Sequence, residues 1–134
     1  MKYVETLKNS ERFCLHDSKI SKIEFIDNKL LLNFSEGFYE AGDAKQKKNC
    51  KLTYKFMIEE DVELNLSVFK ETSKKKKEIK FIDFAEAVKK YGFKIYREFR
   101  CGFTTQIILE GNTPKGSYSI LTQEIDEIIY EYDN

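Results

Sequence analysis

The sequence has little of what catalysis and metal binding usually require. Its 134 residues include no Trp, one Pro, one His and three Cys. No recognisable catalytic motif surrounds the single His, and the close Cys or His pairs that are typical of zinc sites do not occur. We therefore expect a protein with no catalytic residues, no metal and no cofactor.

Long apolar runs and an excess of either charge are also missing. No stretch approaches the roughly 18 apolar residues that cross a bilayer, and the segment Met1–Glu5 carries an acid where a signal peptide needs a basic segment. The odd number of Cys is typical of reduced thiols, so we expect a cytoplasmic protein with no membrane partner. Basic and acidic residues number 23 each, with a pI near 6.6, which argues against general nucleic-acid binding.

What the chain does have is enough apolar residues for a core. Hydrophobic residues make up 41% and aromatic residues 14%, which is too many for a disordered chain. A chain of this length buries roughly two-thirds of the surface that its unfolded form exposes. We find no repeat and no linker, and we expect residues 1–134 to form a single domain.

Alternation of apolar and polar residues dominates the sequence. It is clearest in residues 52–58 and 62–68, which the acidic residues 59–61 separate, and it predicts an antiparallel hairpin there. Residues 20–26 and 29–34 alternate in the same way around Asp27-Asn28. Asp and Asn tolerate the positive φ of a two-residue turn, so a second hairpin is predicted at this point.

One segment has the period of a helix. Asp83 can cap it with Glu86 three residues later, Gly92 can end it, and apolar residues recur at spacings of four and three. We expect a helix near residues 83–91 and strands after it. The tail, residues 117–132, is rich in Ile and Tyr, which favours one or two strands over a helix.

Together these elements predict an α+β domain that is mainly antiparallel β. We expect about seven to nine strands, arranged as a sandwich or an open barrel, with one short helix.

Charge is unevenly distributed along the chain. Residues 45–80 hold eleven Lys and six acids, whereas residues 117–134 hold five acids and no basic residue, so we expect an electrically lopsided molecule. The run Lys74, Lys75, Lys76 and Lys77 would occupy a loop tip. Such a run can simply keep a loop solvated and protect an edge strand, or it can attract a charged partner. Arg is scarce, so nucleic acid is not the expected partner.

Several bulky aromatic residues fall on the outward period of the predicted strands. Tyr and Phe on a wet sheet face suit a protein-binding surface, although they can also pack beneath a helix or a second sheet. The residues concerned are Phe38, Tyr39, Tyr96, Tyr118 and Tyr130. With the lysine run, we take Phe38, Tyr39 and Tyr96 as candidate binding residues.

The segment around His16 offers the strongest alternative chemistry. Cys14 and His16 lie two residues apart, and Asp17 and Ser18 follow. Neighbouring residues on an extended strand point to opposite faces, so His16, Asp17 and Ser18 cannot form a catalytic triad by adjacency. The simplest interpretation is a turn before the strand at Ile20.

Residues 13–39 also carry a resemblance. Leu15-His16-Asp17-Ser18-Lys19-Ile20 precedes the first strand, and Glu36-Gly37-Phe38 follows the second strand of the predicted hairpin. This pattern resembles small uncharacterised β-rich proteins of Gram-positive bacteria, some of which are similar to immunity proteins that neutralise a toxin of their own strain. The resemblance implies a protein that works by binding and supplies no catalytic residues.

We therefore expect a non-enzymatic cytoplasmic binding protein, immunity-like, that engages a protein through a charged and aromatic sheet face. Two alternatives stay open: a small-ligand binder or enzyme with a cleft near His16, and a nucleic-acid or phosphate binder that uses residues 45–80. The sequence leaves the oligomeric state open.

Overall fold

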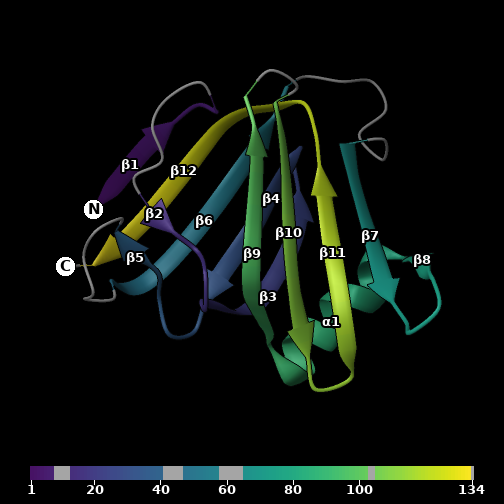
Figure 1. The fold of residues 1–134 in the computed structure, drawn as a ribbon. Helices are drawn as coiled ribbons and strands as arrows, with labels where there is room; N and C mark the ends of the chain where they lie inside the picture. The colour runs from purple at the N-terminus through teal and green to yellow at the C-terminus, as the bar shows by residue number, and fades with distance from the viewer. Residues whose placement is uncertain (8–12, 41–46, 58–64, 103–104, 134) are drawn as a thin grey trace.

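The fold was analysed in a computed structural model that describes residues 1–7, 13–40, 47–57, 65–102 and 105–133. Within these residues the chain forms twelve strands and one α-helix, and every paired strand runs antiparallel to its neighbour (Figure 1). The elements are β1 (Lys2–Glu5), β2 (Phe13–Cys14), β3 (Lys19–Ile26), β4 (Lys29–Phe34), β5 (Tyr39–Glu40), β6 (Lys48–Phe56), β7 (Leu66–Glu71), β8 (Lys76–Ile79), α1 (Phe81–Tyr91), β9 (Phe93–Cys101), β10 (Gln106–Thr113), β11 (Gly116–Thr122) and β12 (Ile125–Asp133).

Ten of these strands form one sheet in the order β1-β12-β6-β4-β3-β9-β10-β11-β7-β8, and β2 pairs with β5 separately. The predicted mainly antiparallel fold with one short helix is thus confirmed. The described residues contain more strands than the seven to nine expected. The additional ones, β1, β2, β5 and β8, are two to four residues long, too short for alternation to reveal.

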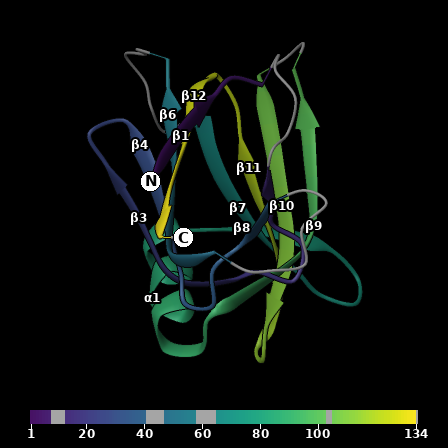
Figure 2. The same cartoon turned by 90° about the vertical axis from the view of Figure 1, so that its left-hand side faces the viewer.

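The large sheet bends so that its two halves face each other, with α1 at one end (Figure 2). The chain crosses between the halves just before β12. There the Met57 amide donates to the Glu124 carbonyl at 2.8 Å, and the Ile125 amide donates to the Thr105 carbonyl at 3.1 Å. The sheet does not close, so β1 and β8 are its edges. The architecture is therefore of the type between a β-sandwich and an open barrel.

The space between the halves is filled with large apolar side chains. Phe13 lies 4.5 Å from Tyr130 between ring centroids, and the Phe38 ring lies 5.5 Å from Tyr130. At the other end, Phe84 of α1 packs on Phe93 and Tyr118. Phe38, Tyr118 and Tyr130 are all buried, so the prediction that they lie on an outward face is wrong for these three. They pack between the halves, as the alternative interpretation allowed.

The predicted hairpin of residues 20–26 and 29–34 is confirmed as β3 and β4. Asp27 and Asn28 form its turn with φ of 52° and 61°. The Asn28 side-chain amide also donates to the Phe56 and Met57 carbonyls, each at 3.1 Å. This turn therefore fixes the end of β6 as well as the hairpin.

The other predicted hairpin, between residues 52–58 and 62–68, does not form. Strand β6 lies between β12 and β4, whereas β7 lies between β11 and β8. Residues 58–64, including the acidic 59–61, lie outside the described residues. Alternation specifies which face of a strand is buried, but it does not specify the neighbouring strand, and that is why the pairing was wrong.

The helix occurs where it was predicted, but it begins earlier. Lys80 occupies the N-cap position and makes no side-chain cap hydrogen bond, so Asp83 is not the cap. The Asp83 amide instead donates to the Lys80 carbonyl, which places Asp83 in the first turn, where a negative charge favours the helix dipole. Gly92, with φ of 75°, ends the helix as expected. No helix among the described residues is long and apolar enough to cross a membrane.

Residues 116–133 form β11 and β12, so the preference for strands over a helix in the tail is confirmed.

Candidate functional site

The structure largely removes the expected separation of charge between residues 45–80 and 117–134. Strand β12 pairs with β6, and three Lys of β6 lie opposite three acids of β12. The Lys55 ammonium lies 3.4 Å from the Glu127 carboxylate. The opposed pairs are Lys48 with Asp133, Lys51 with Glu131, and Lys55 with Glu127. These two segments therefore do not form opposite poles, and the expectation of a lopsided molecule is wrong for them.

A basic surface remains on the hairpin of β7 and β8, which we call the basic hairpin (residues 66–79). Lys74 and Lys75 lie at its turn and Lys76 and Lys77 on β8, all four exposed to solvent. Lys76 lies 3.6 Å from Glu71. Lys70 and Lys77 lie directly opposite each other, a like-charge pair that destabilises the ladder. The run extends from the turn into an edge strand and is not confined to a loop tip.

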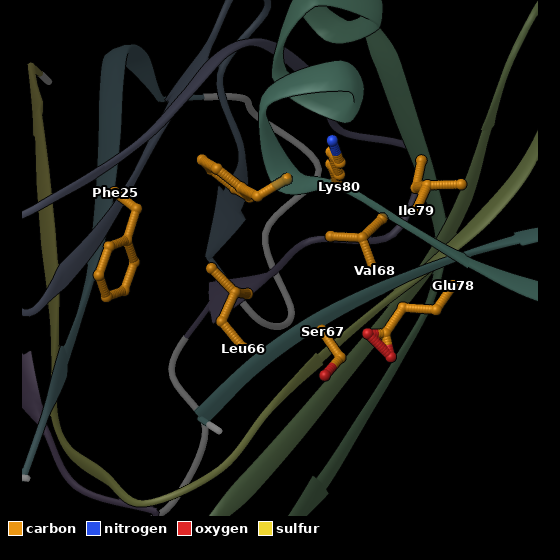
Figure 3. Close-up of a pocket in the computed structure, with 8 residues that line it drawn as sticks. Phe25, Leu66, Ser67, Val68, Glu78, Ile79 and Lys80 are labelled. Atoms are coloured by element: carbon orange, nitrogen blue, oxygen red, sulfur yellow. The ribbon is translucent and has the colours of Figure 1, made fainter. Parts of the chain in front are cut away.

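Next to the basic hairpin is a cavity of about 410 Å³, which we call the apolar groove. Figure 3 shows Leu66, Val68 and Ile79 on one side of the β7–β8 ladder, whereas Ser67 and Glu78 point to the other side. Phe25 of β3 contacts Phe81, with ring centroids 6.5 Å apart. The lining residues are Phe25, Leu66, Ser67, Val68, Glu78, Ile79, Lys80 and Phe81.

The groove lies where the sheet is open, because β8 is an edge and ends at Ile79, just before α1 begins. Its apolar side chains belong to the inward-facing period of β3 and β7, which here extends beyond the fully packed core. Ile82, on the first turn of α1, is largely exposed. The groove is therefore a hollow at the open edge of the sheet whose walls are mainly apolar.

A second groove of about 420 Å³, which we call the His16 groove, contains the residues around His16. It lies between residues 13–16 and residues 96–98 of β9, so Cys14, His16 and Tyr96 share its walls. His16 Nδ1 lies 3.1 Å from Asp17 Oδ2, and these side chains are 60% and 56% exposed. Charged groups so open to water are only weakly coupled. The groove could hold a small ligand, but it gives His16 no desolvated environment for catalysis.

The other groups considered for chemistry do not gather at this groove. Ser18 is buried whereas His16 is exposed, so the structure does not bring them together as a triad. Cys14 and Cys101 are exposed, Cys50 is buried, and no disulfide joins these three described residues. Burial raises the pKa of the Cys50 thiol, against a hydrogen bond from the Phe38 backbone. No group of three His, Cys, Asp or Glu among the described residues could hold a metal ion.

The sequence-predicted binding residues do not form one surface. The four lysines lie on the basic hairpin, whereas Tyr39 is half-buried on β5, opposite Cys14, and Tyr96 lines the His16 groove; Figure 1 shows these strands. Phe38 is fully buried and cannot contact a partner. The lysines therefore lie near the apolar groove and not near the predicted aromatic residues.

The structure also contains a buried polar cluster that the sequence analysis missed. Arg100 Nη1 donates to Glu5 Oε1 at 2.7 Å, and the Tyr130 hydroxyl donates to the same oxygen at 3.0 Å. Arg100 also donates to Tyr130 and lies 3.4 Å from Glu98. The Tyr54 hydroxyl is buried beside them, and among the described residues it has no hydrogen-bond partner.

Electrostatics within this cluster favour a charged Arg100 and neutral tyrosines. Burial alone would lower the pKa of Arg100, but the Glu98 carboxylate and the hydrogen bond to Glu5 outweigh burial and raise it. Burial raises the pKa of Tyr54 and of Tyr130 well above the ordinary value. The side chains of Glu5 and Arg100 are only 0% and 6% exposed. We therefore interpret the cluster as a link between the two halves of the sheet and not as a reaction site.

No clear signal for this cluster was present in the sequence, because Glu5 and Arg100 are next to Val4 and Phe99, apolar residues that alternation would turn inward but that are each 44% exposed. Alternation alone does not distinguish a buried ion pair from a solvated one.

Comparison of the chain with family models, with curated proteins and with solved structures finds no match. The functional argument therefore depends on the geometry alone.

Proposed function

We propose that this chain is a non-catalytic binding protein whose basic hairpin and apolar groove together engage an acidic protein partner. The observation that supports this is the position of Lys74–Lys77, exposed beside a groove of about 410 Å³ with mainly apolar walls. Charged groups steer a partner and select its orientation, and an apolar anchor in a groove supplies affinity. An acidic segment with an apolar residue complements both features.

The basic hairpin suits a protein better than a nucleic acid. Arg97 lies on β9 over Tyr96 and Phe99, and Arg100 is buried, so neither supplements the lysines. Nucleic-acid surfaces usually combine basic side chains with exposed aromatic side chains on which bases stack. The two rings in the groove beside the lysines, Phe25 and Phe81, are half-buried and pack against aliphatic side chains, so an apolar side chain of a polypeptide fits the groove better than a stacked base.

We extend the proposal to an immunity-like role in the cytoplasm. Neutralising a toxin by binding requires a surface and no catalytic group, and the segment that resembles such proteins forms β2, the β3–β4 hairpin and the start of β5. The absence of a disulfide among Cys14, Cys50 and Cys101 is compatible with a reducing compartment. The partner would then be a toxin with an acidic surface segment.

The experiment is a capture from the source cell at low salt, with the captured protein identified and its crosslinks mapped. The test variant carries Lys→Gln at 74, 75, 76 and 77. A matched control carries Lys→Gln at 22, 29, 89 and 90, four exposed lysines elsewhere, so that both variants change the net charge equally. The proposal expects the first variant to lose the partner and the control to keep it. Capture of no partner, or equal capture by both variants, would overturn it.

A further inference from the structure

The outer edge of β8 has unused hydrogen-bonding capacity. In an antiparallel ladder, residues that exchange hydrogen bonds alternate with residues whose N–H and C=O groups point away from that neighbour. The Gln123 amide donates to the Asn65 carbonyl at 3.0 Å, and the Thr72 amide donates to the Lys75 carbonyl at 3.0 Å. The two bonds agree on which residues of β7 direct their N–H and C=O groups toward β8 and which direct them toward β11.

Counting along the ladder from these two bonds assigns the free groups. Val68 pairs with Ile79 and Lys70 with Lys77 through hydrogen bonds, so Lys76 and Glu78 direct their N–H and C=O groups outward. Among the described residues, β7 is the only strand that pairs with β8. Two amides and two carbonyls therefore face away from the sheet beside the apolar groove.

We infer that the acidic partner binds by adding an extended strand to β8, antiparallel to it, with one apolar side chain in the apolar groove. This inference rests on the proposed function. Strand addition supplies affinity through main-chain hydrogen bonds, and alternate side chains give specificity. Every ladder of the sheet is antiparallel, and an antiparallel partner continues its twist and hydrogen-bond pattern.

The side chains of β8 define what such a strand must contain. The partner residue opposite Ile79 faces the groove and is apolar. The residue opposite Lys77 lies on the same face and is acidic, which relieves the repulsion between Lys70 and Lys77. The residue opposite Lys76 is acidic as well. The residue opposite Glu78 is uncharged, because a second carboxylate there would be repelled.

The same pattern argues against a second copy of this chain as the occupant. Two β8 edges paired antiparallel about Lys77 would place the two Lys77 side chains against each other beside the apolar groove, while Lys76 of each copy would face Glu78 of the other. Lysines on an edge strand are a common protection against such pairing. The edge thus favours an acidic strand over a basic one, and self-association of the free chain is measured as a separate outcome of the test.

The test uses a blocked peptide, acetyl-Thr-Val-Thr-Glu-Glu-Glu-amide, in which Val lies opposite Ile79 and the second Thr opposite Glu78. Hydrogen exchange by NMR follows each backbone amide of β8 with and without the peptide. In the free chain the Lys76 and Glu78 amides point away from the sheet. Strand addition predicts that both become protected when the peptide binds. The Lys77 amide already bonds to β7 and should change little.

Backbone methylation provides a matched pair of peptides. A methyl group on the nitrogen of the second Thr blocks a bond to Glu78 and should weaken binding more than tenfold. A methyl group on the nitrogen of Val points away from β8 and should change binding less than threefold. A peptide with Lys in place of Glu should not bind, and analytical ultracentrifugation should show that the free chain does not self-associate through this edge.

A protein variant adds an independent readout. Glu78→Pro removes the outward N–H but leaves the bonds between β7 and β8, and should weaken binding at least tenfold, whereas Glu78→Ala should not. The methylated peptides keep the test decisive if the Pro variant does not fold. Binding without protection of the Lys76 and Glu78 amides would overturn strand addition but keep the proposed function. Loss of all dependence on the four lysines would overturn the proposed function itself.

Discussion

Arg100 on β9 and Glu5 on β1 form a buried ion pair, with Nη1 and Oε1 2.7 Å apart. The two strands belong to opposite halves of the bent sheet, and β1 is one of its edges. Glu98 lies on the other side of the same guanidinium. A short edge strand is thus held by a charged contact across the core as well as by its ladder with β12.

Replacing Arg100 should be much more damaging than replacing Glu5. Arg100→Met leaves the carboxylates of Glu5 and Glu98 buried without their cation, and breaking a buried pair in this way costs about 3–5 kcal/mol. Glu5→Gln keeps an acceptor and leaves Arg100 paired with Glu98, so we expect a loss of about 1–2 kcal/mol. Urea unfolding of the two variants measures the difference. Equal losses would show that Glu98 does not support Arg100.

The two buried tyrosines of the cluster should respond oppositely to removal of the hydroxyl. Tyr130→Phe removes a donor to Glu5 and an acceptor for Arg100, which should cost about 1–3 kcal/mol. Tyr54→Phe removes a hydroxyl that has no partner among the described residues, so stability should stay within about 0.5 kcal/mol or rise. The free energy of unfolding of each variant decides, and a large loss in Tyr54→Phe would reveal a bonded hydroxyl.

Stability should fall in alkaline solution from about pH 10. Burial raises the pKa of Tyr54 and of Tyr130 in the folded chain, whereas both ionise near pH 10 when the chain unfolds. Their contribution is therefore complete below pH 10 and is lost as pH rises toward the folded pKa values, by up to about 2.7 kcal/mol per pH unit for two protons. Absorbance at 295 nm should show two tyrosines that ionise only when the chain unfolds. Titration of all eight tyrosines before unfolding would contradict this.

The turn of the β3–β4 hairpin depends on Asn28 for two separate reasons. Its φ of 61° disfavours residues with a Cβ, and its side-chain amide bonds to the Phe56 and Met57 carbonyls. Asn28→Gly removes only the hydrogen bonds and should cost about 1–2 kcal/mol. Asn28→Ala removes them and adds backbone strain, for a total of about 2–4 kcal/mol. Thermal unfolding of the two variants separates the contributions.

Local patterns in the sequence predicted where the strands and the helix lie better than they predicted which strands pair with each other. The alternation around Asp27-Asn28 specified a hairpin because the turn itself fixes which strands pair. The sequence between residues 52–58 and 62–68 has no comparable turn signal, and β6 pairs instead with β4 and with β12, in which Glu127 lies opposite Lys55 and 72 residues after it. The same long-range pairing places the acids of the tail against the lysines of β6, which no local charge count could show.

The candidate site was predictable only in part, for the same reason. Lys74–Lys77 were found because a run of one charge is a local feature. The apolar groove brings together Phe25 and Ile79, which are far apart in sequence and whose pattern is that of ordinary core residues. Phe38 was misplaced because it lies beyond the end of β4, after Gly37 with φ of 83°, where strand alternation no longer assigns a face.

The proposal that the basic hairpin receives an acidic partner is tested most directly by the reactivity of each lysine. Acetylation of the chain, alone and with the partner that it captures, is followed by mass spectrometry at every lysine. The account predicts that Lys74, Lys75, Lys76 and Lys77 lose reactivity in the complex while Lys22, Lys29, Lys89 and Lys90 keep theirs. Unchanged reactivity of the hairpin lysines, with protection elsewhere, would contradict it.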